Sequence, residues 1–149
     1  MRSSAELVCV DPKRVHEIWP HVAPLLRSAI ARTELSAFAD IEQDILRGKA
    51  LLWLAVGSES GLTPIEAVAS TSLQQTDSGK VCIITGCAGA HMARWLPLIN
   101  HIEAYASAEG CRCIRIFGRK GWLRVLEGYR ARSVVLDKEL GSRTVIGSP

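Results

Sequence analysis

The chain has 149 residues, of which 48% are hydrophobic and 22% charged, and a formal net charge of +3 at pH 7. This length fits a single domain with a substantial core, and the composition is ordinary for a globular protein. No apolar run is long enough to cross a bilayer, and the first residues lack the hydrophobic stretch of a signal peptide. We therefore expect a cytoplasmic protein without a membrane partner.

The chain is expected to begin with a short strand, residues 6–10, and a long amphipathic helix. Asp11 suits the N-cap of that helix, and Pro12 suits its first position, where a missing N–H costs little. Apolar residues then recur at helical spacing. Pro20 and Pro24 lie inside this pattern and are expected to kink or split the helix, because proline cannot donate the backbone hydrogen bond.

A second helix is predicted over residues 37–47, with Ser36 as its N-cap and Gly48 as its C-terminal stop. Three apolar stretches separated by turn residues follow this helix. Their lengths and spacing predict an antiparallel meander of strands over residues 50–56, 64–73 and 81–85.

The stretch 81–117 organises the rest of the chain. It reads as a strand, a small-residue turn, a helix and a second strand, over residues 81–85, 86–90, 94–108 and 111–117. A span this short is a βαβ unit, so its two strands should be parallel. The turn leaves backbone N–H groups at a helix N-terminus, where the helix dipole favours negative charge. If the chain has a ligand site, we expect it at this turn.

A short helix over residues 122–126 and a strand over residues 132–140 are expected to close the fold, and residues 141–149 form a short strand or a flexible tail. Seven basic residues lie between Arg112 and Arg132 and are opposed only by Glu127. This cluster could meet the phosphates of a nucleotide cofactor or of a nucleic acid. A solvated basic face is the simpler interpretation, and the aromatic interleaving of a base-stacking platform is missing.

The five cysteines are an odd number and lie mostly in apolar, strand-like runs. This pattern favours reduced and buried thiols over a disulfide framework. A zinc site formed by Cys82, Cys87, His91 and Cys113 is conceivable, but their spacing lacks the paired Cys-x2-Cys of common structural zinc sites. Small core residues are the better interpretation, and we predict no metal site.

The predicted elements follow the order β, α, α, β, β, β, α, β, α, β. Two segments are distinctive: Ile102-Glu-Ala-Tyr-Ala-Ser-Ala-Glu-Gly110 followed by Cys113-Ile-Arg-Ile116, and Trp122-Leu-Arg-Val-Leu-Glu-Gly-Tyr129. In this order they resemble the GNAT (Gcn5-related N-acetyltransferase) family over nearly the whole chain, and also the short GNAT-like proteins of phages and prophages. The resemblance implies one α+β domain over residues 1–149. Such a domain is a three-layer fold whose mixed, mostly antiparallel sheet carries a central parallel βαβ unit.

The resemblance also implies acetyl-CoA as cosubstrate. In the family its pyrophosphate lies on the turn after the fourth strand, and its pantetheine arm lies in the splay between the fourth and fifth strands. The equivalent residues here are Ile84, Thr85, Gly86, Cys87, Ala88, Gly89, Ala90, His91, Met92, Ala93 and Arg94. Arg119 and Arg124 are further candidates for binding the phosphates. The chain departs from the family motif, because Ile83 occupies the position of a Gln or Arg and Arg94 is the cation that could replace it.

An acetyltransferase of this family needs a base that takes a proton from the amine, often a Glu acting through water. Glu66, in the predicted strand 64–73, is the best-placed carboxylate, and His91 at the turn is a second candidate. An exposed residue on a polar strand face explains Glu66 equally well. Many family members have a Tyr as general acid where this chain has Arg124. Arginine does not give up its proton at neutral pH, although it could stabilise a thiolate.

The leading hypothesis is therefore a GNAT-like N-acetyltransferase that transfers acetyl from acetyl-CoA to an unknown amine. The alternative is a GNAT-fold protein that has lost catalysis and serves as a binding or structural module, for example with a phage protein as partner. A module that binds nucleic acid is the least favoured interpretation. Edge strands near the C-terminus would permit a homodimer.

Overall fold

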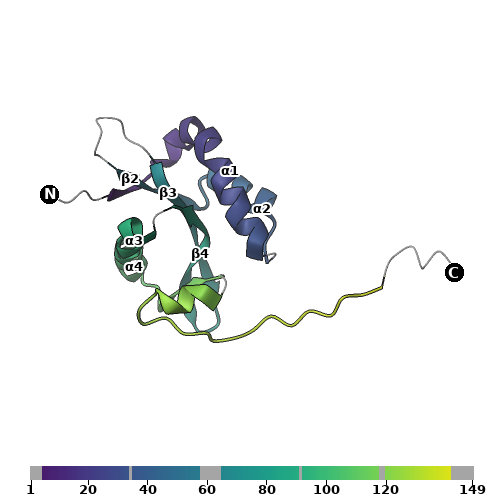
Figure 1. The fold of residues 1–149 in the computed structure, drawn as a ribbon. Coiled ribbons are helices and arrows are strands. Elements are labelled where there is room, and N and C mark those ends of the chain that lie inside the picture. The colour runs from purple at the N-terminus through teal and green to yellow at the C-terminus, as the bar shows by residue number, and fades with distance from the viewer. Residues whose placement is uncertain (1–4, 34, 58–64, 91, 118–119, 142–149) are drawn as a thin grey trace. The chain divides into compact units, whose positions relative to one another are not determined.

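The computed structural model describes residues 5–33, 35–57, 65–90, 92–117 and 120–141. The chain divides into two compact units, residues 1–118 and 119–149. The first unit is a five-stranded sheet with helices on both faces (Figure 1). Within the described ranges, no helix combines the length and the hydropathy that crossing a membrane requires.

The strands of the sheet lie side by side in chain order: β1 (Ala5–Cys9), β2 (Leu51–Gly57), β3 (Ile65–Thr76), β4 (Gly79–Gly89) and β5 (Cys113–Ile116). The first four pair antiparallel, and β5 lies parallel to β4. The predicted antiparallel meander and the predicted parallel pair of the βαβ unit are both confirmed. The result is an α+β fold with a mixed, mostly antiparallel sheet, as the sequence predicts.

Successive side chains along each strand point to opposite faces of the sheet, and each face carries one hydrophobic cluster. Helices α1 (Val15–Thr33) and α2 (Phe38–Leu46) cover one face. Helix α4 (Ile99–Ala108) covers the other. The alternation is visible in β2, where Leu52 packs in the first cluster and its neighbour Trp53 in the second. The three predicted layers are therefore present.

Helix α1 is continuous despite its two prolines. A short 3-10 turn precedes it (η1, Pro12–Arg14), and the side chain of Asp11 accepts a hydrogen bond from the N–H of Lys13 at 2.9 Å, as expected of the N-cap. Pro20 and Pro24 both lie on the exposed side of the helix. The carbonyls four residues earlier lose their helical partner on this same side, where water can replace it. The predicted split of the helix therefore does not occur.

Helix α2 begins without the predicted cap. Its N-cap is Ala37 and not Ser36, and no side chain makes a capping hydrogen bond. Packing fixes this end of the helix instead, because the ring of Phe38 stacks on Trp19 with the ring centroids 6.0 Å apart. Gly48 has a φ of 79° and follows the end of the helix, as predicted.

Strand β4 is longer than predicted and replaces the expected turn over residues 86–90, since residues up to Gly89 pair with β3. The glycines are explained by close packing. A Cβ on Gly86 would lie 3.0 Å from Cγ1 of Ile30 in α1, and a Cβ on Gly89 would lie 2.6 Å from the Cβ of Ala67. The predicted turn is wrong because these small residues allow close approach of strand and helix and do not reverse the chain.

The helix expected over residues 94–108 consists of three shorter pieces: α3 (Met92–Trp95), a 3-10 turn (η2, Leu96–Leu98) and α4. Pro97 lies in the 3-10 turn, where it removes a donor from the helical ladder. Helix α4 ends at Ala108, where the predicted helix ends, and Gly110 follows it with a φ of 80°. The five cysteines are free, as predicted, but only Cys82 is fully buried and Cys9 is exposed.

The second unit contains a 3-10 helix, η3 (Lys120–Arg124), in place of the α-helix expected over residues 122–126. Residues 130–141 have no regular secondary structure, so the predicted strand over residues 132–140 is not formed. A strand needs a hydrogen-bonding neighbour, and none of these residues belongs to a ladder. Their apolar side chains are open to solvent, with 75% of Val134, 60% of Val135, 87% of Leu136 and 83% of Leu140 exposed.

Candidate functional site

The first irregularity of the sheet is a β-bulge at Glu66. Val56 of β2 pairs with Ile65 and the preceding residue, Ala55, pairs with Ala67. This register makes Glu66 the extra residue of β3 at the bulge. A bulge changes the direction of the extra side chain and commonly lies beside an active site.

The second irregularity is a bulge at Thr85 in β4. Thr71 of β3 pairs with Ile84 and the preceding residue, Ser70, pairs with Gly86, so Thr85 is the extra residue. The hydroxyl oxygens of Ser70 and Thr85 lie 2.5 Å apart, and the Thr85 hydroxyl also lies 3.3 Å from the carbonyl oxygen of Ser70. These hydrogen bonds hold the bulge in place.

Beyond this second bulge, β4 continues without β5. The parallel pairing ends where Ile84 lies opposite Ile116, whereas β4 runs on to Gly89. On this side, residues 85–89 have no neighbouring strand in the described part of the chain. We call this stretch the β4 edge. Because strand N–H and C=O groups alternate between the two sides, some of those in the β4 edge point away from β3.

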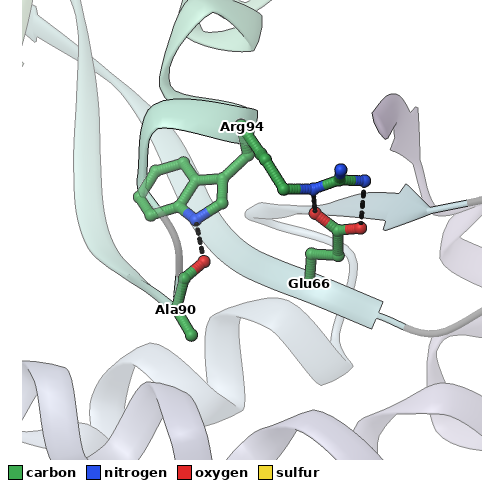
Figure 2. Close-up of polar contacts among 4 residues, drawn as sticks. Glu66, Ala90 and Arg94 are labelled. Atoms are coloured by element: carbon green, nitrogen blue, oxygen red, sulfur yellow. Dashed lines mark hydrogen bonds and ion pairs between the residues drawn. The ribbon is translucent and has the colours of Figure 1, made fainter. Parts of the chain in front are cut away.

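Glu66 and Arg94 form a bidentate ion pair that links β3 to α3. The Nε of Arg94 donates to Oε1 of Glu66 at 2.8 Å, and its Nη2 donates to Oε2 at 2.7 Å (Figure 2). The side chains are only 18% (Glu66) and 30% (Arg94) exposed. Gly57 of β2 makes room for the carboxylate, because a Cβ at this position would fall on Oε2 of Glu66. The structure thus brings the predicted base and the predicted phosphate-binding cation together.

A second contact links α3 to Ala90, the residue after β4. The indole N–H of Trp95 donates to the carbonyl oxygen of Ala90 at 2.8 Å (Figure 2). The Trp95 side chain is buried, with 4% exposed, so the hydrogen bond is shielded from competing water. Two neighbouring residues of α3 are therefore anchored, Arg94 to Glu66 of β3 and Trp95 to the backbone of Ala90. The first two residues of α3, Met92 and Ala93, are exposed.

A small apolar cavity lies between the sheet and the helices α3 and α4. Its volume is about 20 Å³, room for a single water molecule. The lining is apolar and includes Trp53, Ala69, Ile84, Trp95 and Ile102. This space is therefore far too small for a nucleotide cofactor.

The other predicted site residues differ in their access to solvent. Ile84 is buried in the core, residues 85–88 are half-buried, and Gly89 and Ala90 are exposed. Burial raises the pKa of the Cys87 thiol to about 12, so this thiol is protonated at neutral pH and is not a ready nucleophile. Arg124 is exposed on η3 in the second unit.

Two predicted residues lie outside the described residues: His91, the second candidate base, and Arg119, a candidate for the CoA phosphates. In the ranges that the structure does describe, no three His, Cys, Asp or Glu side chains are grouped so that they could hold a metal ion.

Sequence reasoning missed the two bulges and the pairing of Glu66 with Arg94. One signal was available, since Glu66 is the only charged residue between Ile65 and Gln75, in an otherwise uncharged strand. Its partner could not be read from the sequence, because Arg94 lies 28 residues further along the chain.

No family model and no curated protein matches the chain, but solved structures match its fold. A GNAT family acetyltransferase from Staphylococcus aureus aligns with a TM-score of 0.59 and 9% identity, over 92% of this chain and 99% of its own. A predicted acetyltransferase from Clostridium acetobutylicum, solved with acetyl-CoA, aligns with a TM-score of 0.59 and 12% identity, over 91% and 96%.

An aminoglycoside acetyltransferase from an uncultured soil metagenomic sample, in complex with sisomicin, aligns with a TM-score of 0.66 and 8% identity, over 93% of this chain and 97% of its own. At such identities the likeness concerns the fold. The chain therefore has the fold of GNAT acetyltransferases, as the resemblance in its sequence implies.

Proposed function

We propose that the protein is an N-acetyltransferase that transfers the acetyl group of acetyl-CoA to an amine. The observation that carries this proposal is the β4 edge: an accessible stretch of strand backbone that begins where the parallel strand β5 ends. Fold alone does not establish activity, so the proposal depends on whether this edge suits the cosubstrate.

The β4 edge suits an extended chain of amides such as pantetheine. A strand edge offers N–H and C=O groups at regular spacing, and an amide chain can pair with them as a further strand would. Gly86, Ala88 and Gly89 keep side chains out of the way. In the proposal, the backbone around Ala90 and the exposed start of α3 meet the pyrophosphate, which small residues permit.

Glu66 is the proposed base that accepts a proton from the amine, acting through water. Its ion pair with Arg94 favours the ionised carboxylate, which is the form that accepts a proton. His91 remains the second candidate. Glu66→Gln should lower kcat more than it lowers acetyl-CoA affinity.

The test of the proposal is a calorimetric titration with acetyl-CoA. We expect a Kd in the micromolar range, about −8 kcal/mol. Ala90→Asp should weaken binding by about tenfold or more, because a carboxylate would face the pyrophosphate across an exposed surface. Ala104→Asp is the matched control, since Ala104 is an exposed alanine on α4, and it should leave binding unchanged. If millimolar acetyl-CoA gives no binding, the proposal is wrong.

The alternative function is a catalytically inactive binding or structural module, for example with a phage protein as partner. The specific observation in its favour is that Arg94, the proposed replacement for the cation of the family motif, is engaged by Glu66. Release of CoA thiol in the presence of an amine panel distinguishes the two functions. Because a structural neighbour binds the aminoglycoside sisomicin, the panel should begin with aminoglycosides. Binding of acetyl-CoA without turnover of any amine would favour the inactive module.

A further inference from the structure

The ion pair of Glu66 and Arg94 joins two groups that the proposed reaction needs separately. The reaction needs a carboxylate that takes a proton from the amine and a cation that meets the phosphates of acetyl-CoA. In the structure these two groups bind each other through hydrogen bonds of 2.8 and 2.7 Å (Figure 2). A carboxylate whose two oxygens both accept from a guanidinium is stabilised in its ionised form, so it is a weak proton acceptor.

The backbone of α3 has an anchor besides this ion pair. The indole N–H of Trp95 donates to the carbonyl oxygen of Ala90 at 2.8 Å, and the Trp95 side chain is buried. The Arg94 side chain is 30% exposed, so a ligand that approaches from solvent can reach its guanidinium. A change of side-chain rotamer can therefore move Arg94 from Glu66 to another anion while Trp95 keeps α3 in place.

A phosphate suits Arg94 as well as a carboxylate does. Arginine binds the oxygens of both groups with the same bidentate geometry. The pyrophosphate of acetyl-CoA carries more negative charge than one carboxylate, so its attraction for Arg94 is stronger. In the proposed function the pyrophosphate meets the backbone around Ala90, which is bonded to the residue next to Arg94. The exchange of partners therefore requires the movement of one side chain.

The exchange would make Glu66 a stronger proton acceptor. Its side chain is only 18% exposed, and Gly57 leaves room for the carboxylate close to the sheet. Partial burial disfavours the ionised form, and the attraction of Arg94 opposes this effect. When Arg94 moves to the phosphate, this attraction is reduced and the carboxylate takes up a proton more readily.

We propose that acetyl-CoA activates the base by drawing Arg94 away from Glu66. Glu66 then accepts a proton from the amine after the cosubstrate has bound. The amine nitrogen bonds to the acetyl carbon, the C–S bond breaks, CoA leaves as the thiolate, and the proton of the amine passes to Glu66 through water. This inference rests on the proposed function and adds an order to it, with acetyl-CoA binding first and the amine second. The contact between Glu66 and Arg94 is then the resting state of an active enzyme.

The test is the affinity of Glu66→Gln for acetyl-CoA, measured by calorimetry. Glutamine carries no charge and holds Arg94 weakly, so this variant should bind acetyl-CoA about fivefold more tightly than the unmodified chain does. Its kcat should fall while its affinity rises. The matched control is Glu17→Gln, which removes the carboxylate of the exposed pair with Arg14 and changes the net charge equally. This control should leave the Kd unchanged.

A double variant tests whether Arg94 is responsible for the gain. In an Arg94→Met background, the further change Glu66→Gln should add no affinity for acetyl-CoA. Circular dichroism verifies that the variants fold. If Arg94→Met does not fold, Arg94→Lys takes its place, and in that background Glu66→Gln should add less affinity, because lysine lacks the bidentate fork. Acetyl-pantetheine, which has no phosphate, is the ligand control and should bind Glu66→Gln and the unmodified chain equally.

The outcomes separate this inference from the proposed function. Equal affinity of Glu66→Gln and the unmodified chain for acetyl-CoA would overturn the inference and leave the proposed function standing. So would a gain that persists in Arg94→Met, or an equal gain with Glu17→Gln or with acetyl-pantetheine. If neither Glu66→Gln nor the unmodified chain binds acetyl-CoA, the proposed function and the inference are both wrong.

Discussion

The ion pair between Glu66 and Arg94 is the strongest polar contact at the candidate site. Two parallel hydrogen bonds of 2.8 and 2.7 Å give it the fork geometry that distinguishes arginine from lysine. Partial burial limits the competition from water, while the room left by Gly57 allows the carboxylate to approach the sheet closely. The pair therefore fixes the position of α3 relative to β3.

A double-mutant cycle with Glu66→Gln and Arg94→Met measures this pair. Each single variant should lose about 1–2 kcal/mol of unfolding free energy, and the coupling between them should be about 1 kcal/mol. Urea denaturation provides the measurement. The control cycle uses Arg14→Met and Glu17→Gln, an exposed pair at 3.1 Å, where the coupling should stay below about 0.5 kcal/mol. Equal coupling in the two cycles would show that burial adds nothing to the Glu66 pair.

At the scale of elements, β4 controls the site because it changes partners along its length. From Val81 to Ile84 it pairs with both β3 and β5, and beyond the bulge at Thr85 only β3 pairs with it among the described strands. Glycine is required in this last part, since a side chain at Gly89 would meet both the Cβ of Ala67 and the carbonyl oxygen of Glu66 at 2.6 Å. Close strand packing thus accounts for a glycine that the sequence alone associates with phosphate binding.

Gly89→Ala should destabilise the protein by about 1–3 kcal/mol, because the added methyl group must push β3 and β4 apart. Gly141→Ala is the control, since a Cβ there meets no atom within 4 Å, and the change should stay within about 0.5 kcal/mol. Thermal and urea unfolding of both variants check the difference. An unchanged stability of Gly89→Ala would mean that the two strands can separate freely at this point.

The elements of the first unit were predictable where periodicity and length agree. The meander, the parallel pair and the end of α2 at Gly48 follow from local patterns. The turn over residues 86–90 was mispredicted because small residues permit both a chain reversal and a tightly packed strand, and only β3 decides between them. The strand over residues 132–140 failed for a related reason, since β-propensity is realised only when a neighbouring strand is present.

The site was less predictable than the fold. The sequence marked the end of β4 and selected Glu66 and Arg94, but as residues with separate roles. Their pairing depends on a bulge that redirects Glu66, and a bulge leaves no distinct signal in a strand of small residues. Whether Glu66, His91 or the residues 84–94 serve in binding or catalysis stays a prediction for the titration and activity experiments.

For the molecule as a whole, the thiols of the buried Cys82 and the half-buried Cys87 make stability sensitive to alkali. Burial raises the pKa of Cys82 to about 11, with a smaller contribution from nearby Cys111, and burial raises that of Cys87 to about 12, from an ordinary value of 9.0. The unfolded chain therefore releases these protons at a lower pH than the folded chain. Stability should be intact below pH 9 and fall as the pH rises towards 12, by at most about 1.4 kcal/mol per pH unit for each thiol.

Urea unfolding in reducing buffer between about pH 8 and about pH 11 tests this dependence. The variant with Cys82→Ala and Cys87→Ala should show a flatter decline than the unmodified chain, whatever its stability at neutral pH. Tyr105 remains in both proteins and contributes to the decline in each, since its pKa is raised first by burial and further by neighbouring groups that include Cys82. If the two slopes are the same, the thiols do not ionise on unfolding as their surroundings indicate.

Because two prolines lie on its exposed side, helix α1 depends on packing against the sheet to remain helical. Pro20 and Pro24 remove two of its internal hydrogen bonds, so a peptide of this sequence would have little helical order by itself. What maintains the helix is the contact of Val22, Leu26 and Ile30 with the strands below. Secondary and tertiary order should therefore be lost together here, without residual helix in the unfolded chain. The amide protons of α1 would then exchange with solvent only when the whole first unit opens, which makes this helix a reporter of global unfolding.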